Sequence, residues 1–216
     1  MSTVAERPRE RLRAARRDIG RSHLVEAAER VFAERGYEGA RMQDIAAEAG
    51  LALATVYGLF DGKEQLYAEV HRVRGQALLQ RAAQATVGAR SAWDALLASV
   101  CAYAEHLVEH PDYLRLHLRE SQPWALSPRF SSDTQNALWR EGLELTVVAF
   151  AAALAEGSVV DGPPELHARL MIAAHQVFLG EWVENGMREQ KAELVRRMQA
   201  YVERAFGKSR VSRARR

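Results

Sequence analysis

Three histidines in the middle of the chain have a spacing that could serve metal binding. His106 and His110 are four residues apart, so a helix would place both imidazoles on one face, and His117 follows nearby. No cysteine stands at a matching spacing, and the sequence contains no HExxH motif. The same segment carries two glutamates and ends at a proline, which is typical of a solvated helix end. We therefore expect no bound metal and no other cofactor.

Other catalytic chemistry has no support in the sequence either. There is no GxSxG motif, no glycine-rich phosphate loop and no ordered Ser-His-Asp arrangement. The single cysteine, Cys101, excludes an intrachain disulfide and is interpreted as a small buried apolar residue rather than a reactive thiol. No apolar run reaches the length of a membrane span, and the amino terminus does not resemble a secretory signal. We expect a cytoplasmic protein that is not an enzyme and does not contact a membrane.

The charge of the chain is distributed unevenly, although its formal net charge is only +2. Residues 1–21 carry seven arginines against three acids, and residues 207–216 carry five basic residues and no acid. Basic ends on an acidic body suit a polyanion such as nucleic acid. The amino-terminal segment is either a solvated terminus or an arm that lies along DNA. Its candidate contacts are Arg16, Arg17 and Arg21, which stand closest to the helix that follows.

Three helices in residues 22–70 would position such contacts. The first has apolar residues at helical spacing and stops at Gly36, because glycine tolerates the left-handed conformation of many helix ends. The second begins near Met42 and ends at Gly50, and the third covers residues 53–59. Two short helices joined by a glycine turn and propped by a longer helix form the helix-turn-helix pattern.

Residues 22–70 resemble the amino-terminal domain of the TetR (tetracycline-repressor-like) transcriptional regulators. The resemblance covers roughly a quarter of the chain without a gap and is carried by Ala27, Ala28, Phe32, Gly36, Tyr37, Asp44, Ile45, Ala46, Ala49, Gly50, Thr55, Val56, Tyr57, Phe60, Lys63 and Glu64. It implies a homodimer that binds double-stranded DNA, with carboxy-terminal helices that bind a small molecule and pair two subunits. It also implies that Tyr57 and Lys63 bind phosphate, while Thr55 can donate to a phosphate or a base edge.

Several positions depart from the family pattern. Leu53 and Ala54 begin the third helix and offer only apolar contact, to thymine methyl groups. Arg41 stands where the family typically has a threonine that caps the second helix. Its side chain cannot accept the capping hydrogen bond, but its guanidinium can bind phosphate, and Gln43 is a second candidate there. These departures shift sequence readout toward DNA shape and the arm.

The remainder of the chain indicates six further helices, which makes about nine in an all-α fold. We expect them near residues 63–85, 91–110, 112–120, 133–155, 164–186 and 189–206, with Ser91 and Asp112 as caps. Residues 121–132 should form a loop. The predicted organisation is a basic arm (1–21), a helix-turn-helix DNA-binding domain (22–67), a helical effector-binding and dimerisation domain (68–206) and a disordered basic tail (207–216).

The last two helices supply the candidate dimer interface, and the aromatic residues supply a candidate ligand site. The helix at residues 166–186 is apolar around much of its circumference, so a partner subunit, a ligand pocket or the same chain must cover it. His175 is a polar group among apolar neighbours there, either a satisfied core histidine or a hydrogen-bonding partner for a ligand. Residues that could line a pocket, or fill the core, are Trp93, Tyr103, Trp124, Trp139, Phe150, Met171, His175, Phe178 and Trp182.

These observations predict a ligand-responsive transcriptional regulator. By family habit it is a repressor, released from a palindromic operator by a small apolar or amphipathic effector. The alternative is a helical ligand-binding protein with a degenerate DNA-binding unit that acts through protein partners. The acidic composition of residues 22–70 favours this alternative, and the two basic ends oppose it. A salt-dependent affinity for DNA distinguishes the two.

Overall fold

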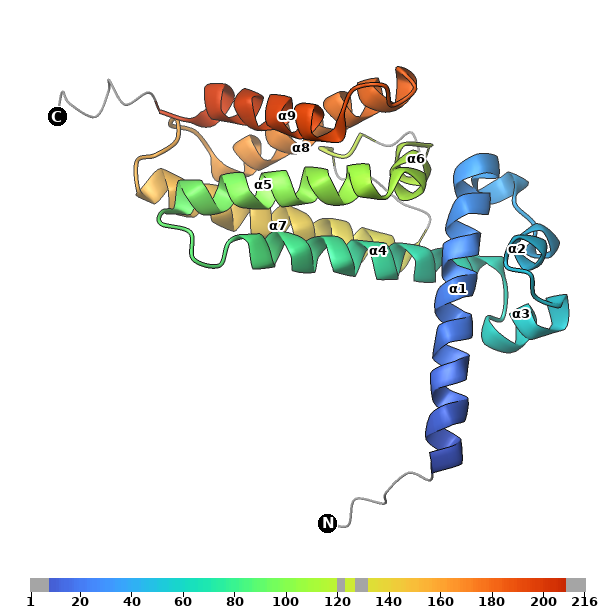
Figure 1. Ribbon diagram of the computed structural model, residues 1–216. Helices are drawn as coiled ribbons and strands as arrows, with labels where there is room; N and C mark the ends of the chain where they lie inside the picture. Colours follow the sequence, from blue (N-terminus) through green and yellow to red (C-terminus); the bar gives the residue numbers. More distant parts are fainter. Residues whose placement is uncertain (1–7, 120–122, 127–131, 209–216) are drawn as a thin grey trace, which may run out of the picture. The chain divides into compact units, whose positions relative to one another are not determined.

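The computed structural model describes residues 8–119, 123–126 and 132–208, with side chains from residue 17 onward (Figure 1). Within these residues the chain forms nine helices and no strand, which confirms the predicted all-α fold. The helices are α1 (Pro8–Gly39), α2 (Met42–Glu48), α3 (Leu53–Leu59), α4 (Lys63–Ala85), α5 (Ala92–Glu109), α6 (Pro111–Arg119), α7 (Asp133–Ala155), α8 (Pro164–Glu184) and α9 (Lys191–Phe206). None of the described helices is long and apolar enough to cross a membrane.

The chain divides into two compact units, with the boundary between Val70 and His71. Unit 1 contains α1, α2, α3 and the start of α4, and unit 2 contains the rest of α4 and α5 to α9. Helix α4 is therefore one continuous helix with residues in both units.

Helix α1 is longer than expected. Residues 8–21, which we expected to form an arm separate from the first helix, continue that helix instead, because their arginines, alanines and leucine are good helix formers. Residues 1–7 of the predicted arm lie outside the described part of the chain. Near the other end, Gly36 has φ 70° and ψ 170°, which interrupts the helix where we expected it to stop.

Unit 1 has a core shared by all its helices. Phe32 of α1, Ile45 of α2, Val56 of α3 and Leu66 of α4 are each fully buried. Small residues of α1, such as Ala28, are buried beside them, and small residues allow helices to cross closely. The two short helices are too short to be stable alone, so this packing fixes their positions.

Three of the five predicted helix starts in unit 2 are correct, including that of α8 at Pro164, whereas α6 and α9 begin elsewhere, α9 at Lys191 rather than at residue 189. The Ser91 hydroxyl accepts a hydrogen bond from the Asp94 amide at 3.0 Å and caps α5. Helix α7 begins after Ser132 at the predicted residue. Helix α6, however, starts at Pro111 rather than after an Asp112 cap, because a proline in the first turn needs no N–H partner. The Asp112 carboxylate instead accepts from Arg115 at 2.9 Å.

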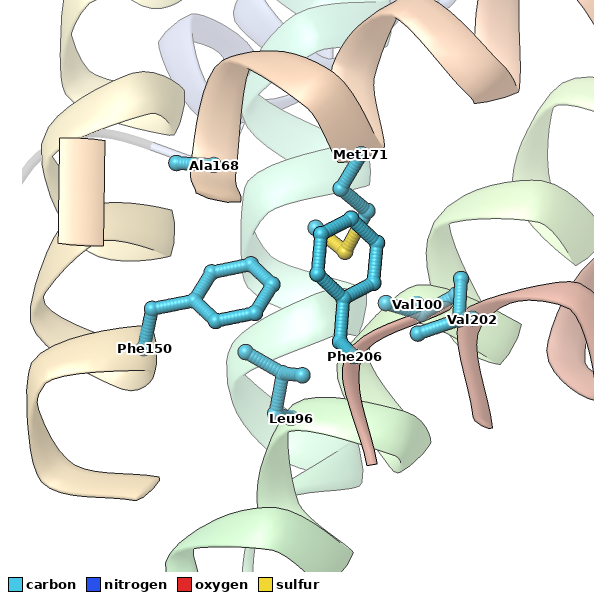
Figure 2. Packing of buried hydrophobic residues seen from close by; sticks show 7 residues of the cluster. All are labelled: Leu96, Val100, Phe150, Ala168, Met171, Val202 and Phe206. Carbon is cyan, nitrogen blue, oxygen red and sulfur yellow. The ribbon is translucent and has the colours of Figure 1, made fainter. Parts of the chain in front are cut away.

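Unit 2 is a helical bundle in which α5 packs against α7 and α9, and α8 packs against the same two helices. One core cluster draws residues from all four helices, as Figure 2 shows: Leu96, Val100, Phe150, Ala168, Met171, Val202 and Phe206. At this end of the bundle, the Lys208 amide donates to the Ser158 carbonyl at 2.9 Å, and Val159 and Gly207 form an antiparallel bridge. Residues 207 and 208, which we expected in a disordered tail, are thus bound to the turn between α7 and α8. Residues 209–216 lie outside the description.

Candidate nucleic-acid interface and ligand cavity

The turn between α2 and α3 fixes how α3 is presented. Gly50 has φ 62°, and its amide donates to the Ala47 carbonyl at 3.1 Å. The next amide, of Leu51, donates to the Ala46 carbonyl at 2.9 Å. This pair of bonds is the Schellman arrangement, which satisfies the last carbonyls of α2 and favours glycine at the position that Gly50 occupies.

Helix α3 buries one face and exposes the other. Val56 is fully buried, whereas Ala54, Thr55 and Tyr57 are exposed, the last by 49%. Leu53, which we expected to reach DNA, is only partly exposed at the first position of the helix. The solvent-facing side of α3 therefore presents one aliphatic hydroxyl and one phenol that can hydrogen-bond a nucleic acid.

Two further candidates lie at the start of α2. Arg41 occupies the N-cap position with extended backbone and makes no capping hydrogen bond, as its chemistry predicted. Both Arg41 and Gln43 are exposed. A phosphate at this position would meet the guanidinium of Arg41 beside the first amides of the helix.

Two of the three candidate arginines of α1 have described side chains, and these two differ in their exposure and in their partners. The side chain of Arg16 lies outside the described part, and Arg17 is exposed. Arg21 is engaged within unit 1. Its guanidinium donates to the Leu59 carbonyl at 3.0 Å and to the Glu69 carboxylate at 3.3 Å, and it lies 4.0 Å from the centroid of the Phe60 ring. Arg21 thus fixes the end of α3 against α1 and α4.

Lys63 is engaged in the same way. Its ammonium donates to the carbonyls of Tyr37 at 2.7 Å and Ala40 at 3.2 Å, and lies 4.4 Å from the centroid of the Tyr37 ring. Two more cations are paired with acids of α2, since Arg30 contacts Glu48 at 2.6 Å and Arg35 contacts Asp44 at 2.6 Å.

Of the four basic side chains in the range 22–70, only that of Arg41 makes no ion pair or hydrogen bond within the described chain. The acidic character that the sequence showed for this unit is therefore partly internal, because carboxylates of α2 neutralise the arginines of α1. The cation that remains available to an external phosphate stands at the start of α2.

Unit 2 contains a cavity with a volume of about 320 Å³. Its wall is drawn from α4, α5, α6, α7 and α8, and from the segment between α6 and α7. Leucines of α4, α5 and α7 make much of the wall. Five of the residues that we predicted for a pocket line this cavity: Tyr103, Trp124, Trp139, Met171 and His175.

The remaining aromatic candidates are not in the cavity wall. Phe150 is fully buried in the core cluster (Figure 2). Trp93 packs against that cluster. Phe178 packs against Tyr201 of α9, with ring centroids 5.5 Å apart. The indole nitrogen of Trp182 donates to the Glu189 carbonyl at 2.9 Å and so closes the turn between α8 and α9. These four residues therefore pack within the protein rather than line the cavity.

The polar groups of the cavity are uncharged. Burial lowers the pKa of His175 to about 4 and that of His117 to about 4, so both imidazoles are neutral at pH 7. The His175 ring stacks on Tyr103, with centroids 5.2 Å apart and planes at 18°. Its Nε2 atom is buried and has no hydrogen-bond partner among the described residues.

The sequence did not identify several residues of the wall. Tyr113 and His117 of α6 and Gln135 of α7 line the cavity, as does Gly75 of α4. Little in the sequence indicated that these residues line a cavity, because α6 is short and because a cavity wall has the same apolar periodicity as a core. Gly75 could not be recognised because its role is steric: a Cβ there would lie 2.6 Å from a methyl carbon of Leu138.

The histidines considered for metal binding are dispersed by packing. His106 and His110 lie with ring centroids 4.6 Å apart, whereas the ring of His117 packs against Trp124 at 4.5 Å. In the described part of the chain, no group of three or more His, Cys, Asp or Glu side chains is placed to hold a metal ion.

Known proteins resemble this chain in sequence and in fold. Residues 24–70 match the model of the bacterial regulatory proteins of the tetR family, which confirms the resemblance for the amino-terminal domain. The HTH-type transcriptional repressor NicS of Pseudomonas putida is 27% identical to this chain over 163 residues, or 76% of each protein.

Solved structures share the fold along most of the chain. The ketosteroid transcriptional regulator KstR2 of Mycobacterium tuberculosis matches with a TM-score of 0.72 at 22% identity, over 88% of this chain and 95% of that one. The regulator FadR of Bacillus subtilis, solved in complex with stearoyl-CoA, matches with a TM-score of 0.71 at 18% identity, over 84% and 96% of the two chains.

Proposed function

We propose that this chain, whose amino-terminal domain matches the model of the tetR family, is a ligand-responsive transcriptional repressor. It binds a palindromic operator as a homodimer and is released by a small molecule held in unit 2. The observation that carries the proposal is the exposed face of α3, with Thr55 and Tyr57, in a domain of matching sequence. The repressor NicS, similar over 76% of its length, supports the sign of regulation. Such a protein acts in the cytoplasm, where bacterial DNA lies.

We propose DNA contacts for the candidates other than Arg21 and Lys63, whose side chains are bonded within unit 1. Thr55 and Tyr57 of α3 contact phosphates or base edges, and Ala54 contacts thymine methyl groups. Arg41 and Gln43 bind phosphate at the start of α2, and Arg16 and Arg17 of α1 add contacts outside the helix-turn-helix. The list of direct contacts is Arg16, Arg17, Arg41, Gln43, Leu53, Ala54, Thr55 and Tyr57, while Arg21 and Lys63 position the elements that carry them.

Helix α4 is the element through which the effector acts in this proposal. It begins with Lys63, which is bonded to the end of α1, and its later residues Gly75, Leu78 and Leu79 line the cavity. An effector weakens operator binding only if it favours an arrangement of α4 that fits DNA poorly. A continuous helix with residues in both units is suited to transmit that preference.

The dimer forms through α8 and α9 in this proposal. Leu166, Leu170 and Val177 of α8 are all at least half exposed, and their spacing of four and seven residues puts them on one side of the helix. A second copy of the chain would bury this apolar strip in a symmetric interface. Leu170→Glu should convert the dimer to a monomer, which light scattering measures, while thermal unfolding shows that the fold remains.

The function is tested by selecting bound sequences from a random DNA pool with the full chain at two salt concentrations. A repressor of this kind recovers a palindromic motif, and the half-site spacing reports the distance between the two α3 helices. Recovery of only sequence-blind binding that is lost at the higher salt would overturn the proposal. It would favour a helical ligand-binding protein that acts through protein partners.

A further inference from the structure

We propose that the cavity of unit 2 takes an uncharged, predominantly apolar molecule with one hydroxyl group, and that His175 hydrogen-bonds this hydroxyl. The inference rests on the proposed function, because it names the chemical class of the effector. It is carried by the charge of the cavity wall, by the hydrogen-bonding state of the wall and by the position of one buried imidazole.

The wall offers nothing to neutralise a charged ligand. Among the described residues that line the cavity there is no Lys, Arg, Asp or Glu. The two lining histidines are neutral at pH 7, because burial lowers the pKa of each to about 4. A carboxylate or an ammonium group brought into this cavity would lose its hydration without gaining an ion partner, which is strongly unfavourable.

Two arginines close to the wall already have partners for their charge. Arg169 lies 5.9 Å from the centroid of the Trp139 ring, but its guanidinium is bonded to the Glu165 carboxylate at 2.9 Å and to the Ala125 carbonyl at 2.6 Å. Arg81 of α4 is bonded to Glu105 at 3.0 Å and to Glu109. Neither arginine has a free charge to offer a ligand.

Several polar groups of the wall have donated their hydrogen within the protein. The hydroxyl of Ser99 donates to the Leu96 carbonyl at 2.8 Å, and that of Thr146 donates to the Gly142 carbonyl at 2.8 Å. The indole nitrogen of Trp139 donates to the Trp124 carbonyl at 2.8 Å. These bonds leave the three groups no hydrogen to offer a ligand.

His175 differs from those groups. It is only 3% exposed, and its Nε2 has no partner within the described residues, a costly state for a buried polar atom. The stacking of its ring on Tyr103 limits how the imidazole can turn. A neutral imidazole has one donor and one acceptor nitrogen, and a hydroxyl can serve as either partner. A ligand hydroxyl therefore satisfies His175 in either tautomer without bringing a charge into the cavity.

Three probes that share one ring system test the ligand class: 2-naphthol, naphthalene and 2-naphthoate. Their binding to the full chain is measured by calorimetry at pH 7. We expect 2-naphthol to bind, and 2-naphthoate to bind at least about a hundredfold more weakly because its carboxylate has no cation to meet. Binding of 2-naphthoate as tight as that of 2-naphthol, or no binding of 2-naphthol, would overturn the proposal.

Paired variants of α8 test the role of His175. His175→Phe keeps a flat ring beside Tyr103, so we expect it to weaken 2-naphthol roughly tenfold and to leave naphthalene unchanged. His175→Gln should recover part of the loss, because its amide can donate and accept. The matched control is His167→Phe, which alters a buried histidine of the same helix that does not line the cavity. Equal losses in the two phenylalanine variants, or an equal loss for naphthalene, would refute the assignment.

Failure of the ligand class can be told from failure of the repressor function. Probe binding is measured without DNA, and operator binding is then measured with and without each probe. Probes that bind in the expected order but leave operator affinity unchanged would support the ligand class and overturn the effector role. Release of the operator by 2-naphthoate but not by 2-naphthol would overturn the ligand class and leave the repressor function standing.

Discussion

The ammonium nitrogen of Lys63 lies 2.7 Å from the carbonyl oxygen of Tyr37, so the first residue of α4 is bonded to the end of α1. The same ammonium lies 3.2 Å from the Ala40 carbonyl. The carbonyls at the end of a helix have no partner inside that helix. A lysine that the sequence assigned to phosphate thus holds two helices of unit 1 together.

This contact predicts that Lys63 matters for stability. Lys63→Met keeps the length of the side chain but removes the ammonium, and it should lower the free energy of unfolding by roughly 1–3 kcal/mol. Urea unfolding of the full chain measures the change. Arg17→Met, at an exposed position of α1, is the control and should leave stability nearly unchanged. A Lys63→Met variant of normal stability would mean that these bonds contribute little.

Arg41 should act on DNA affinity instead. Because the Arg41 side chain is exposed and makes no ion pair or hydrogen bond within the described chain, Arg41→Ala should weaken binding to all sequences and reduce the slope of log affinity against log salt by about 0.9. Fluorescence anisotropy with operator DNA at several salt concentrations measures that slope. Arg30→Ala, which removes a cation already paired with Glu48, is the matched control. A larger effect from Arg30 than from Arg41 would contradict this assignment.

Two glycines, one before α3 and one within it, should respond in opposite ways to alanine. Gly50 has φ 62°, so Gly50→Ala should destabilise the protein by roughly 1–2 kcal/mol. Gly58 lies within α3, and a Cβ there would meet no atom within 4 Å. Gly58→Ala should therefore stabilise the protein by roughly 0.5–1 kcal/mol. Thermal unfolding of both variants checks the signs, and a stabilising Gly50→Ala would exclude the Schellman turn.

Acid should destabilise unit 2 through its buried histidines. Burial and the neighbouring His117 lower the pKa of His71 to about 3, and burial lowers the pKa of His175 to about 4. The unfolded chain takes up these protons near pH 6.5, whereas the folded chain does not. The contribution of these histidines to the free energy of unfolding is therefore fully present above pH 6.5 and is lost as the pH falls toward 4. Each such histidine should cost roughly 1–2 kcal/mol between pH 7 and pH 5.

Urea unfolding of the full chain at pH 7 and pH 5 measures this effect. His71→Phe keeps a ring beside Tyr113, with which His71 has an edge contact at 5.6 Å, and it should make stability less dependent on pH. Equal stability at the two pH values would show that these imidazoles do not remain neutral in the folded protein.

Local rules were sufficient to predict most of the helices. Glycines with positive φ stand at Gly36 and Gly50, where the sequence placed helix ends, and α4 has the predicted bounds. The sequence did not predict that residues 8–21 belong to the first helix, because their charge was considered as a signal for DNA and their helix propensity was not. Residues 8–21 show that an arginine-rich segment can be strongly basic and helical at the same time.

The functional residues were harder to predict because their types do not reveal their partners. Arg21 and Lys63 have the same chemistry as Arg41, and only the structure shows that their cations are already bonded to carbonyls of the same unit. Likewise, Trp139 and Trp182 are indistinguishable in the sequence. One lines the cavity, whereas the other closes a turn.

Helix α4 limits where this protein can be joined to a relative in a chimera. The family match ends at residue 70, yet the helix continues without a break to Ala85. A chimera that exchanges effector-binding units at this boundary must therefore be spliced inside a helix. Each residue gained or lost at the junction turns the helix that follows by about 100°. Functional hybrids should consequently be confined to junctions that preserve the helical phase of α4, and random junctions should mostly give proteins that bind DNA but ignore their effector.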